Sequence, residues 1–157
     1  ALVKVDDFNV SLNDFTLSFD AKKTIFTNED CMSFMLQLFD QNLNRIEVFS
    51  AKNCNVSNVE FYLPDEIKNP LKETSGMYNV PAINSVWENN LWHNIELKTK
   101  NKICSIKIDG QLVFSGTAPE NLLNLREIWL VFEGNGQAKN IVLKSGDTIK
   151  LKDHVIP

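Results

Sequence analysis

Apolar and polar residues alternate with a period of two along most of the chain. In FTLSFD at 15–20, Phe15, Leu17 and Phe19 alternate with polar residues. Alternation of this kind is typical of a strand with one buried face. The same pattern predicts further strands at 3–10, 33–40, 45–50, 58–63, 92–99, 103–109, 111–115, 126–134, 139–145 and 147–153.

Turn signals separate these segments. QNLN at 41–44 predicts a hairpin turn, and KNK at 100–102 predicts another. Asp109-Gly110 is a strong tight-turn dipeptide, because glycine accepts a positive φ without steric cost. Residues 92–115 therefore predict a meander of three strands.

Helical periodicity is almost absent. Only PENLLNLRE at 119–127 could hold one short turn, with its leucines toward the core. About ten short strands at close spacing indicate a sandwich or a barrel. The length of 157 residues and the hydrophobic fraction of 43% fit one domain, spanning residues 1–157, with a substantial core.

The interval from 64 to 90 departs from this regularity. It contains three prolines and few strand signals. Irregular connections of this length often carry recognition, because a rigid scaffold holds them at the surface. We therefore expect ligand contacts there.

Charge argues against a nucleic-acid partner. The formal net charge is −4 and the pI is about 5.2, whereas nucleic-acid binding usually needs a basic patch. Lysines gather at 98–102 and 144–152, alternating with apolar residues. This alternation favours the solvated face of edge strands over a nucleic-acid or heparin patch. No apolar run approaches the ~18 residues of a membrane-spanning helix, so no transmembrane segment is predicted.

The three cysteines are widely spaced and form no Cys-x-x-Cys pair. They fit either one disulfide with one free thiol or three reduced thiols. Cys104 is expected to be buried, because it shares a strand face with other apolar residues, so Cys31 and Cys54 form the candidate disulfide. Asn9 and Asn55 begin Asn-x-Ser triplets and are candidate glycosylation sites. These features favour a secreted or extracellular protein.

The stretch WHNIELKTKNKICSIKIDGQLV at 92–113 resembles the middle of laminin G-like domains and of the wider concanavalin A-like jelly rolls, pentraxins included. The later GTAPENLLNLREIWLVFEG at 116–134 also resembles part of such domains. The resemblance implies an all-β fold, a two-sheet antiparallel β-sandwich. It also implies that the Trp and the second turn are mainly structural. The matching positions are Trp92, His93, Ile95, Leu97, Ile106, Ile108, Asp109 and Gly110.

The sugar-binding motifs of related folds are missing. Galectins carry His-x-Asn-x-Arg and Trp-x-x-Glu segments that grip galactose. Here no suitably spaced Arg follows His93-Asn94, and Glu88 follows Trp87 directly. The Glu-x-Asp-x-x-Glu run of glycosidases with this fold is also absent, so we predict a protein that is not an enzyme.

Neither histidine predicts catalysis. His93 shares the inward face of its strand with Ile95 and Leu97, so we interpret it as structural; His154 lies three residues from the end, where we expect solvent. No cofactor is predicted. A bound calcium ion is a further hypothesis, because Asp6, Asp7, Asp40, Asn42 and Asn44 offer oxygens near turns, although DQNLN at 40–44 lacks the Gly and distal Glu of an EF-hand.

Aromatic side chains are the candidate ligand contacts, because flat amphipathic rings stack on sugars and anchor protein interfaces. We select Trp129, Tyr78 and Trp87. Trp129 alternates with core residues and should face outward, unless the long interval covers it. Trp87 could instead pack locally near Trp92.

The sequence thus predicts a recognition module that binds glycan or protein through a sheet face or rim loops. The alternative is a structural or assembly subunit, a homo-oligomer that uses an outer sheet face as its interface. A glycan-active enzyme is the least favoured hypothesis.

Overall fold

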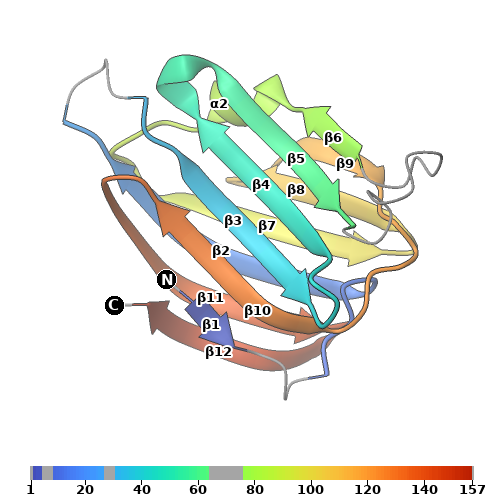
Figure 1. The fold of residues 1–157 in the computed structure, drawn as a ribbon. Helices are drawn as coiled ribbons and strands as arrows, with labels where there is room; N and C mark the ends of the chain where they lie inside the picture. Colours follow the sequence, from blue (N-terminus) through green and yellow to red (C-terminus); the bar gives the residue numbers. More distant parts are fainter. Residues whose placement is uncertain (1, 5–8, 27–30, 64–75, 157) are drawn as a thin grey trace.

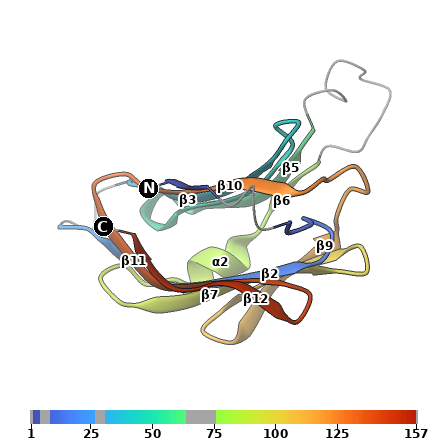
Figure 2. The same cartoon turned by 90° about the horizontal axis from the view of Figure 1, so that it is seen from below.

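The computed structural model describes residues 2–4, 9–26, 31–63 and 76–156, and within 2–4 and 152–156 it describes the backbone only. Two six-stranded antiparallel sheets pack face to face (Figures 1 and 2). This arrangement confirms the predicted all-β sandwich.

Sheet A runs in the order β1-β10-β3-β4-β5-β6. Its strands are Leu2–Lys4 (β1), Leu125–Phe132 (β10), Phe34–Asp40 (β3), Arg45–Ala51 (β4), Val56–Tyr62 (β5) and Gly76–Asn79 (β6). Sheet B runs in the order β12-β11-β2-β7-β8-β9. Its strands are Thr148–Ile156 (β12), Asn135–Ser145 (β11), Phe15–Thr24 (β2), His93–Lys100 (β7), Ile103–Ile108 (β8) and Gln111–Thr117 (β9).

The core lies between the two sheets and follows the period of two. Every second residue of β2 is buried, from Phe15 to Lys23, and β3 alternates in the same way from Phe34 to Asp40. Successive side chains of a strand point to opposite faces, so one face of each sheet enters the core and the other is left for solvent or ligand. This division produces two outer faces.

The connections hold the sheets at their ends. A short helix α2, Pro81–Val86, places Ile83 in the core, and Figure 2 shows this helix between the two layers. A 3-10 turn η2, Lys52–Cys54, follows β4. Part of the irregular interval, 64–75, lies outside the described residues, while 76–79 forms strand β6, which the sequence pattern did not reveal.

The predicted turns are present. Asp109 and Gly110 have φ values of 52° and 79°, and Asn101 and Lys102 have 51° and 66°. Positive φ at both central residues is the geometry that joins two twisted antiparallel strands most tightly. In 119–127, a turn precedes β10, with Leu122 and Leu125 buried and Leu123 exposed.

Candidate functional site: the outer face of sheet A

Three cross-strand rows of side chains form the outer face of sheet A. The register of β10, β3, β4, β5 and β6 aligns alternate, incompletely buried positions across the sheet. The middle row is Trp129, Gln37, Glu47, Glu60 and Met77. One flanking row is Glu127, Phe39, Arg45 and Tyr62, and the other is Val131, Met35, Phe49, Asn58 and Asn79.

Polar contacts fix the centre of this face. Arg45 Nε lies 3.1 Å from Glu47 Oε2, and Gln37 Nε2 donates to the same oxygen at 2.7 Å. The Arg45 guanidinium also lies 4.3 Å from the centroid of the Tyr62 ring, within the range of a cation–π contact. Because each group is held by a neighbour on an adjacent strand, the centre of the face is organised before any ligand arrives.

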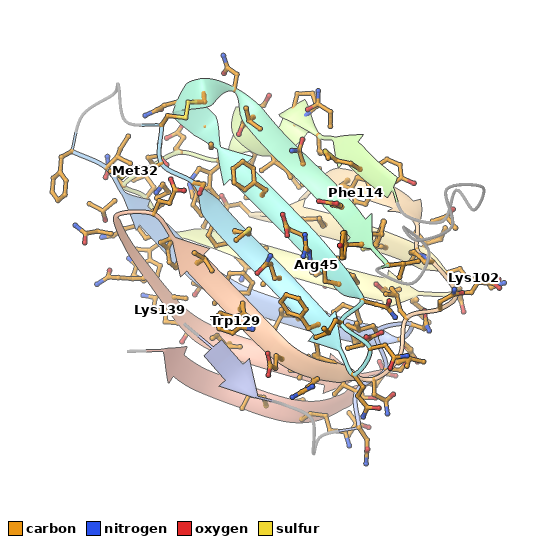
Figure 3. All side chains as sticks on the ribbon, viewed as in Figure 1. Met32, Arg45, Lys102, Phe114, Trp129 and Lys139 are labelled. Carbon is orange, nitrogen blue, oxygen red and sulfur yellow. A yellow bond between two sulfur atoms is a disulfide. The ribbon has the colours of Figure 1, made fainter. Side chains whose placement is uncertain are left out.

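Trp129 is the most prominent aromatic side chain here. It is 36% exposed, and its Nε1 donates to Glu127 Oε2 at 3.0 Å. Figure 3 shows Trp129 and Arg45 on neighbouring parts of the same face. A ring fixed by its N–H and open to solvent is a platform on which an apolar sugar or peptide surface can stack.

The electrostatic character of the three rows is acidic. Glu47, Glu60 and Glu127 lie in these rows with Arg45, and Arg126 of β10 lies 3.8 Å from Glu127, so three carboxylates share the face with two cations. Carboxylates and amides accept and donate hydrogen bonds of the kind that hydroxyl groups make. The chemistry of this face suits an uncharged, hydroxyl-rich ligand better than an anionic one.

The structure does not bring the three predicted contact residues together. Trp129 faces outward from sheet A, as its position in the strand predicted. Tyr78 lies at the open edge between the sheets, where its ring centroid is 6.1 Å from that of Phe61 and 5.4 Å from that of Phe114. It is 42% exposed but is separate from the outer face.

Trp87 requires a correction. Its side chain is 2% exposed and stacks on Phe34, with ring centroids 5.5 Å apart. It also packs against His93 at 4.6 Å. Burial of this large ring in the core closes one end of the sandwich, so Trp87 offers no surface to a ligand.

Sequence reasoning missed most of the outer face. Arg45, Glu47 and Phe49 alternate in RIEVFS, and Met35, Gln37 and Phe39 alternate in FMLQLF, so their common outward direction was available from parity. The pattern could not tell which strands are neighbours. Trp129 meets Gln37 and Glu47 only because β10 lies beside β3 in sheet A.

His93 has a structural role. It is 5% exposed, its Nδ1 donates to Asp109 Oδ2 at 2.6 Å, and its Nε2 accepts from the Glu88 backbone N–H at 3.0 Å. Partial burial raises the pKa of the Asp109 carboxyl, but hydrogen bonds from His93 and from the Asn94 amide outweigh it, so that pKa lies below its usual value. The pair ties the start of β7 to the turn between β8 and β9.

His154 lies within β12 opposite Ile141. Its backbone is therefore part of sheet B, whereas the sequence led us to expect a solvated chain end. Its side chain lies outside the described residues.

Of the candidate calcium residues, Asp6 and Asp7 lie outside the described residues, and those around the 41–44 turn serve a different purpose. Asp40 is fully buried, and its two oxygens accept hydrogen bonds at 2.8–3.0 Å from Asn42, Asn44 and Leu123. An oxygen that accepts two N–H donors has little capacity left for a cation. Across the described ranges, no group of three or more His, Cys, Asp or Glu side chains is arranged to hold a metal.

The covalent features lie away from the outer face. A disulfide joins Cys31 to Cys54, with Cα atoms 5.5 Å apart, and Cys104 is a buried free thiol. Asn9 and Asn55 are exposed and both adopt positive φ, at 52° and 54°. Their glycosylation stays a prediction.

Comparison with solved structures finds chains of the same architecture. A galectin of Caenorhabditis elegans, LEC-6, is 14% identical, with 92% of this chain and 89% of that chain covered and a TM-score of 0.59. A tetrameric galectin from the sponge Cinachyrella is 11% identical, with 92% and 97% covered and a TM-score of 0.65. The carbohydrate-binding module CBM66 from Bacillus subtilis is 11% identical, with 87% and 80% covered and a TM-score of 0.52.

The chain shares its two-sheet β-sandwich fold with these galectins and with this carbohydrate-binding module. The same fold occurs within a larger enzyme: a fructosyltransferase from A. japonicus is 13% identical, with a TM-score of 0.61, and 99% of this chain covers 24% of that one. No protein-family model matches the sequence, and no curated protein is a significant relative. At these identities the likeness concerns the fold alone.

Proposed function

We propose that the protein is a non-enzymatic recognition module that binds a neutral glycan on the outer face of sheet A. One observation carries the proposal: an exposed Trp129 stands in the same cross-strand row as Gln37 and Glu47, beside a fixed Arg45. A sugar ring needs this combination of a flat apolar surface and directed hydrogen-bonding groups. The galectins and the carbohydrate-binding module of similar fold give further support.

Neutral rather than acidic glycans fit the charge of the face. Glu47, Glu60 and Glu127 outnumber the cations Arg45 and Arg126 on this face, so its net negative charge disfavours a sulfate or a uronate. The same carboxylates can accept hydrogen bonds from sugar hydroxyls, and such charge-assisted bonds are stronger than neutral ones.

The site can be tested with two tryptophans of similar exposure. Trp129 is 36% exposed on sheet A, and Trp92 is 39% exposed beside Lys22 and Lys139 of sheet B. A neutral glycan selected on an array should bind Trp129→Ala about tenfold more weakly in calorimetry, because an aromatic contact contributes roughly 1 kcal/mol or more. Trp92→Ala should bind it as the wild type does.

Two results would overturn the proposal. One is equal weakening by both tryptophan variants, and the other is unchanged binding by Trp129→Ala. Glu47→Gln provides a second probe, because it keeps the shape of the side chain but removes the charged acceptor at the centre of the face.

Self-association through the same face is the second candidate. It is favoured by the apolar side chains that stand among the polar ones, namely Phe39, Phe49, Met35 and Val131. Light scattering during size-exclusion chromatography would reveal an oligomer, and Trp129→Ala should shift it toward the monomer if this face is the interface. A monomer at all concentrations would exclude this alternative.

Secretion is proposed together with this function. The disulfide between Cys31 and Cys54 suits an oxidising compartment, and both glycosylation candidates are exposed. None of the helices in the described part of the chain has the length and apolar character to cross a bilayer. Expression through a secretory pathway, followed by enzymatic removal of N-glycans, would show a mobility shift if Asn9 or Asn55 is modified.

A further inference from the structure

Sheet B brings together lysines that are distant in the sequence. Lys144 on β11 is in register with Thr16 on β2, which is in register with Lys98 on β7. Because neighbouring strands are ~4.8 Å apart, the backbones carrying Lys98 and Lys144 are only about 10 Å apart. Both β7 and β11 have a strand on each side, so Lys98 and Lys144 do not lie on edge strands as expected, whereas Lys150 lies on the edge strand β12.

The outer face of sheet B is strongly basic. Among the residues whose side chains the structure describes, the outward positions of β2, β7, β8 and β11 carry six lysines and two carboxylates, Asp20 and Glu96. Within the described residues, none of these lysines forms an ion pair. The Asp20 carboxylate is already engaged by the side-chain amides of Asn94 and Asn140, at 3.0 and 2.8 Å. The six lysines are Lys22, Lys98, Lys100, Lys107, Lys139 and Lys144.

Two shallow hollows lie side by side on this face. One, of about 260 Å³, is lined by Glu96, Lys98, Lys100, Ile103, Ser105 and Lys107. The other, of about 350 Å³, is lined by Thr16, Ser18, Asn94, Glu96, Val142 and Lys144. They share Glu96 and therefore form one continuous strip, in which ammonium groups alternate with hydroxyl and amide groups.

One end of the strip has an aromatic platform. Lys139 Nζ lies 4.0 Å from the centroid of the Trp92 ring, and Lys22 Nζ lies 5.6 Å from it. A sugar ring stacked against Trp92 would place its acidic substituents beside two ammonium groups.

We propose that the outer face of sheet B binds an acidic polysaccharide, one that carries sulfate or uronate groups. The lysines would pair with the acidic substituents, and Thr16, Ser18, Ser105 and Asn94 would hydrogen-bond to the hydroxyl groups between them. This site is separate from the neutral-glycan site on sheet A and does not depend on it. The protein would then bind two kinds of glycan on opposite faces.

The side-chain types favour a polysaccharide over nucleic acid. The hydroxyl and amide side chains between the lysines match the sugar hydroxyl groups of a polysaccharide. Single-stranded nucleic acid is usually held by several stacking aromatic side chains, and this strip has Trp92 alone among its members. The protein as a whole carries a net charge of −4, unlike nucleic-acid-binding domains.

Heparin oligosaccharide is a suitable probe, with dextran as the neutral comparison. The double variant Lys98→Gln with Lys107→Gln removes two charges from the strip. The matched control is Lys102→Gln with Arg126→Gln, which removes one charge from a turn and one from sheet A. Both variants change the formal net charge from −4 to −6, but the control removes cations that are paired with Glu120 and Glu127, away from the strip.

The wild type should bind heparin with an affinity that falls as salt rises, and any binding of dextran should be the same in the wild type and in the strip variant. The strip variant should bind roughly 3- to 10-fold more weakly, because each exposed ion pair contributes a modest free energy, and its salt dependence should be shallower. The control variant should bind heparin with an affinity within about twofold of the wild type, because salt screens charges that lie far from the bound heparin. Trp129→Ala should bind heparin with the affinity of the wild type. Loss of neutral-glycan binding on sheet A can then be told apart from loss of heparin binding on sheet B.

Three outcomes would overturn this inference. These are equal weakening in both double variants, absence of heparin binding at low salt, and binding of duplex DNA or phosphatidylserine vesicles as tight as that of heparin. Unchanged circular dichroism and unfolding temperature would establish that each variant is folded.

Discussion

The buried carboxylate of Asp40 gives the most quantitative prediction. It lies at the end of β3, and its two oxygens accept four hydrogen bonds from the 41–44 turn and from Leu123, just before β10. The side chain therefore fastens together the ends of three strands that carry the outer face of sheet A. We expect Asp40→Ala to loosen this end of the sheet.

The expected cost follows from these bonds. Each hydrogen bond to a charged group contributes about 1.5–3 kcal/mol, and buried N–H donors left without a partner cost about 1–3 kcal/mol each. Removing the carboxylate also removes its own desolvation cost, so the contributions do not simply add. We expect Asp40→Ala to lower the free energy of unfolding by roughly 3–5 kcal/mol, with a fall in Tm of roughly 10 °C.

Asp40→Asn keeps the volume of the side chain and changes only its hydrogen bonds and its charge. Its single oxygen can keep the bonds from the Asn42 and Asn44 backbone amides, while its NH₂ group faces the Leu123 N–H. We expect about half the cost of Asp40→Ala. Urea unfolding with the disulfide intact would measure both from the midpoint at an unchanged slope.

The exposed Asp14 provides the control, because Asp14→Ala should change stability by less than about 0.5 kcal/mol. A cost below about 1 kcal/mol for Asp40→Ala would refute the role given to this carboxylate. An equal cost for Asn and Ala would show that the hydrogen bonds from the turn contribute little.

Four further predictions follow from single contacts. Replacing Cys31 and Cys54 with Ser should lower stability by about 3 kcal/mol, because the bridge closes a 23-residue separation; urea midpoints would show it. Burial raises the pKa of the Cys104 thiol to about 12, so a thiol reagent at pH 8 should label one Cys only after unfolding. The lowered pKa of Asp109 means that its contribution is present above the unfolded pKa of about 4 and lost as pH falls through the folded value. The stability difference between wild type and Asp109→Asn should thus shrink in acid, and a constant difference would contradict this. Calcium chloride should leave Tm unchanged, since N–H donors occupy the carboxylate of the 41–44 turn; an upward shift would indicate a calcium site.

Parity along the strands predicted much that the structure shows. His93 and Cys104 were expected inside because they alternate with apolar residues, and both are buried. Trp129 was expected outside for the same reason. These predictions depend only on the direction of a side chain relative to its neighbours two residues away, which the strand geometry sets locally.

Trp87 shows where local reasoning ended. It lies between a short helix and β7, in no strand, so no periodicity indicated its direction. Its burial depends on Phe34 of sheet A and on His93 of sheet B. The surroundings of a side chain in a connection are determined by the elements that happen to close over it.

The sequence by itself determined the period of two, the tight turns and the inward or outward direction of most side chains, because each depends on residues close together in the chain. Only the tertiary structure decided which strands are neighbours. The placement of β10 beside β3 joins Trp129 to Gln37 and Glu47, and the placement of β2 between β7 and β11 gathers Lys98 and Lys144 on one face. Strand order and register are set by the packing of two whole sheets against a shared core, and that cooperative fit has no counterpart in a short stretch of sequence.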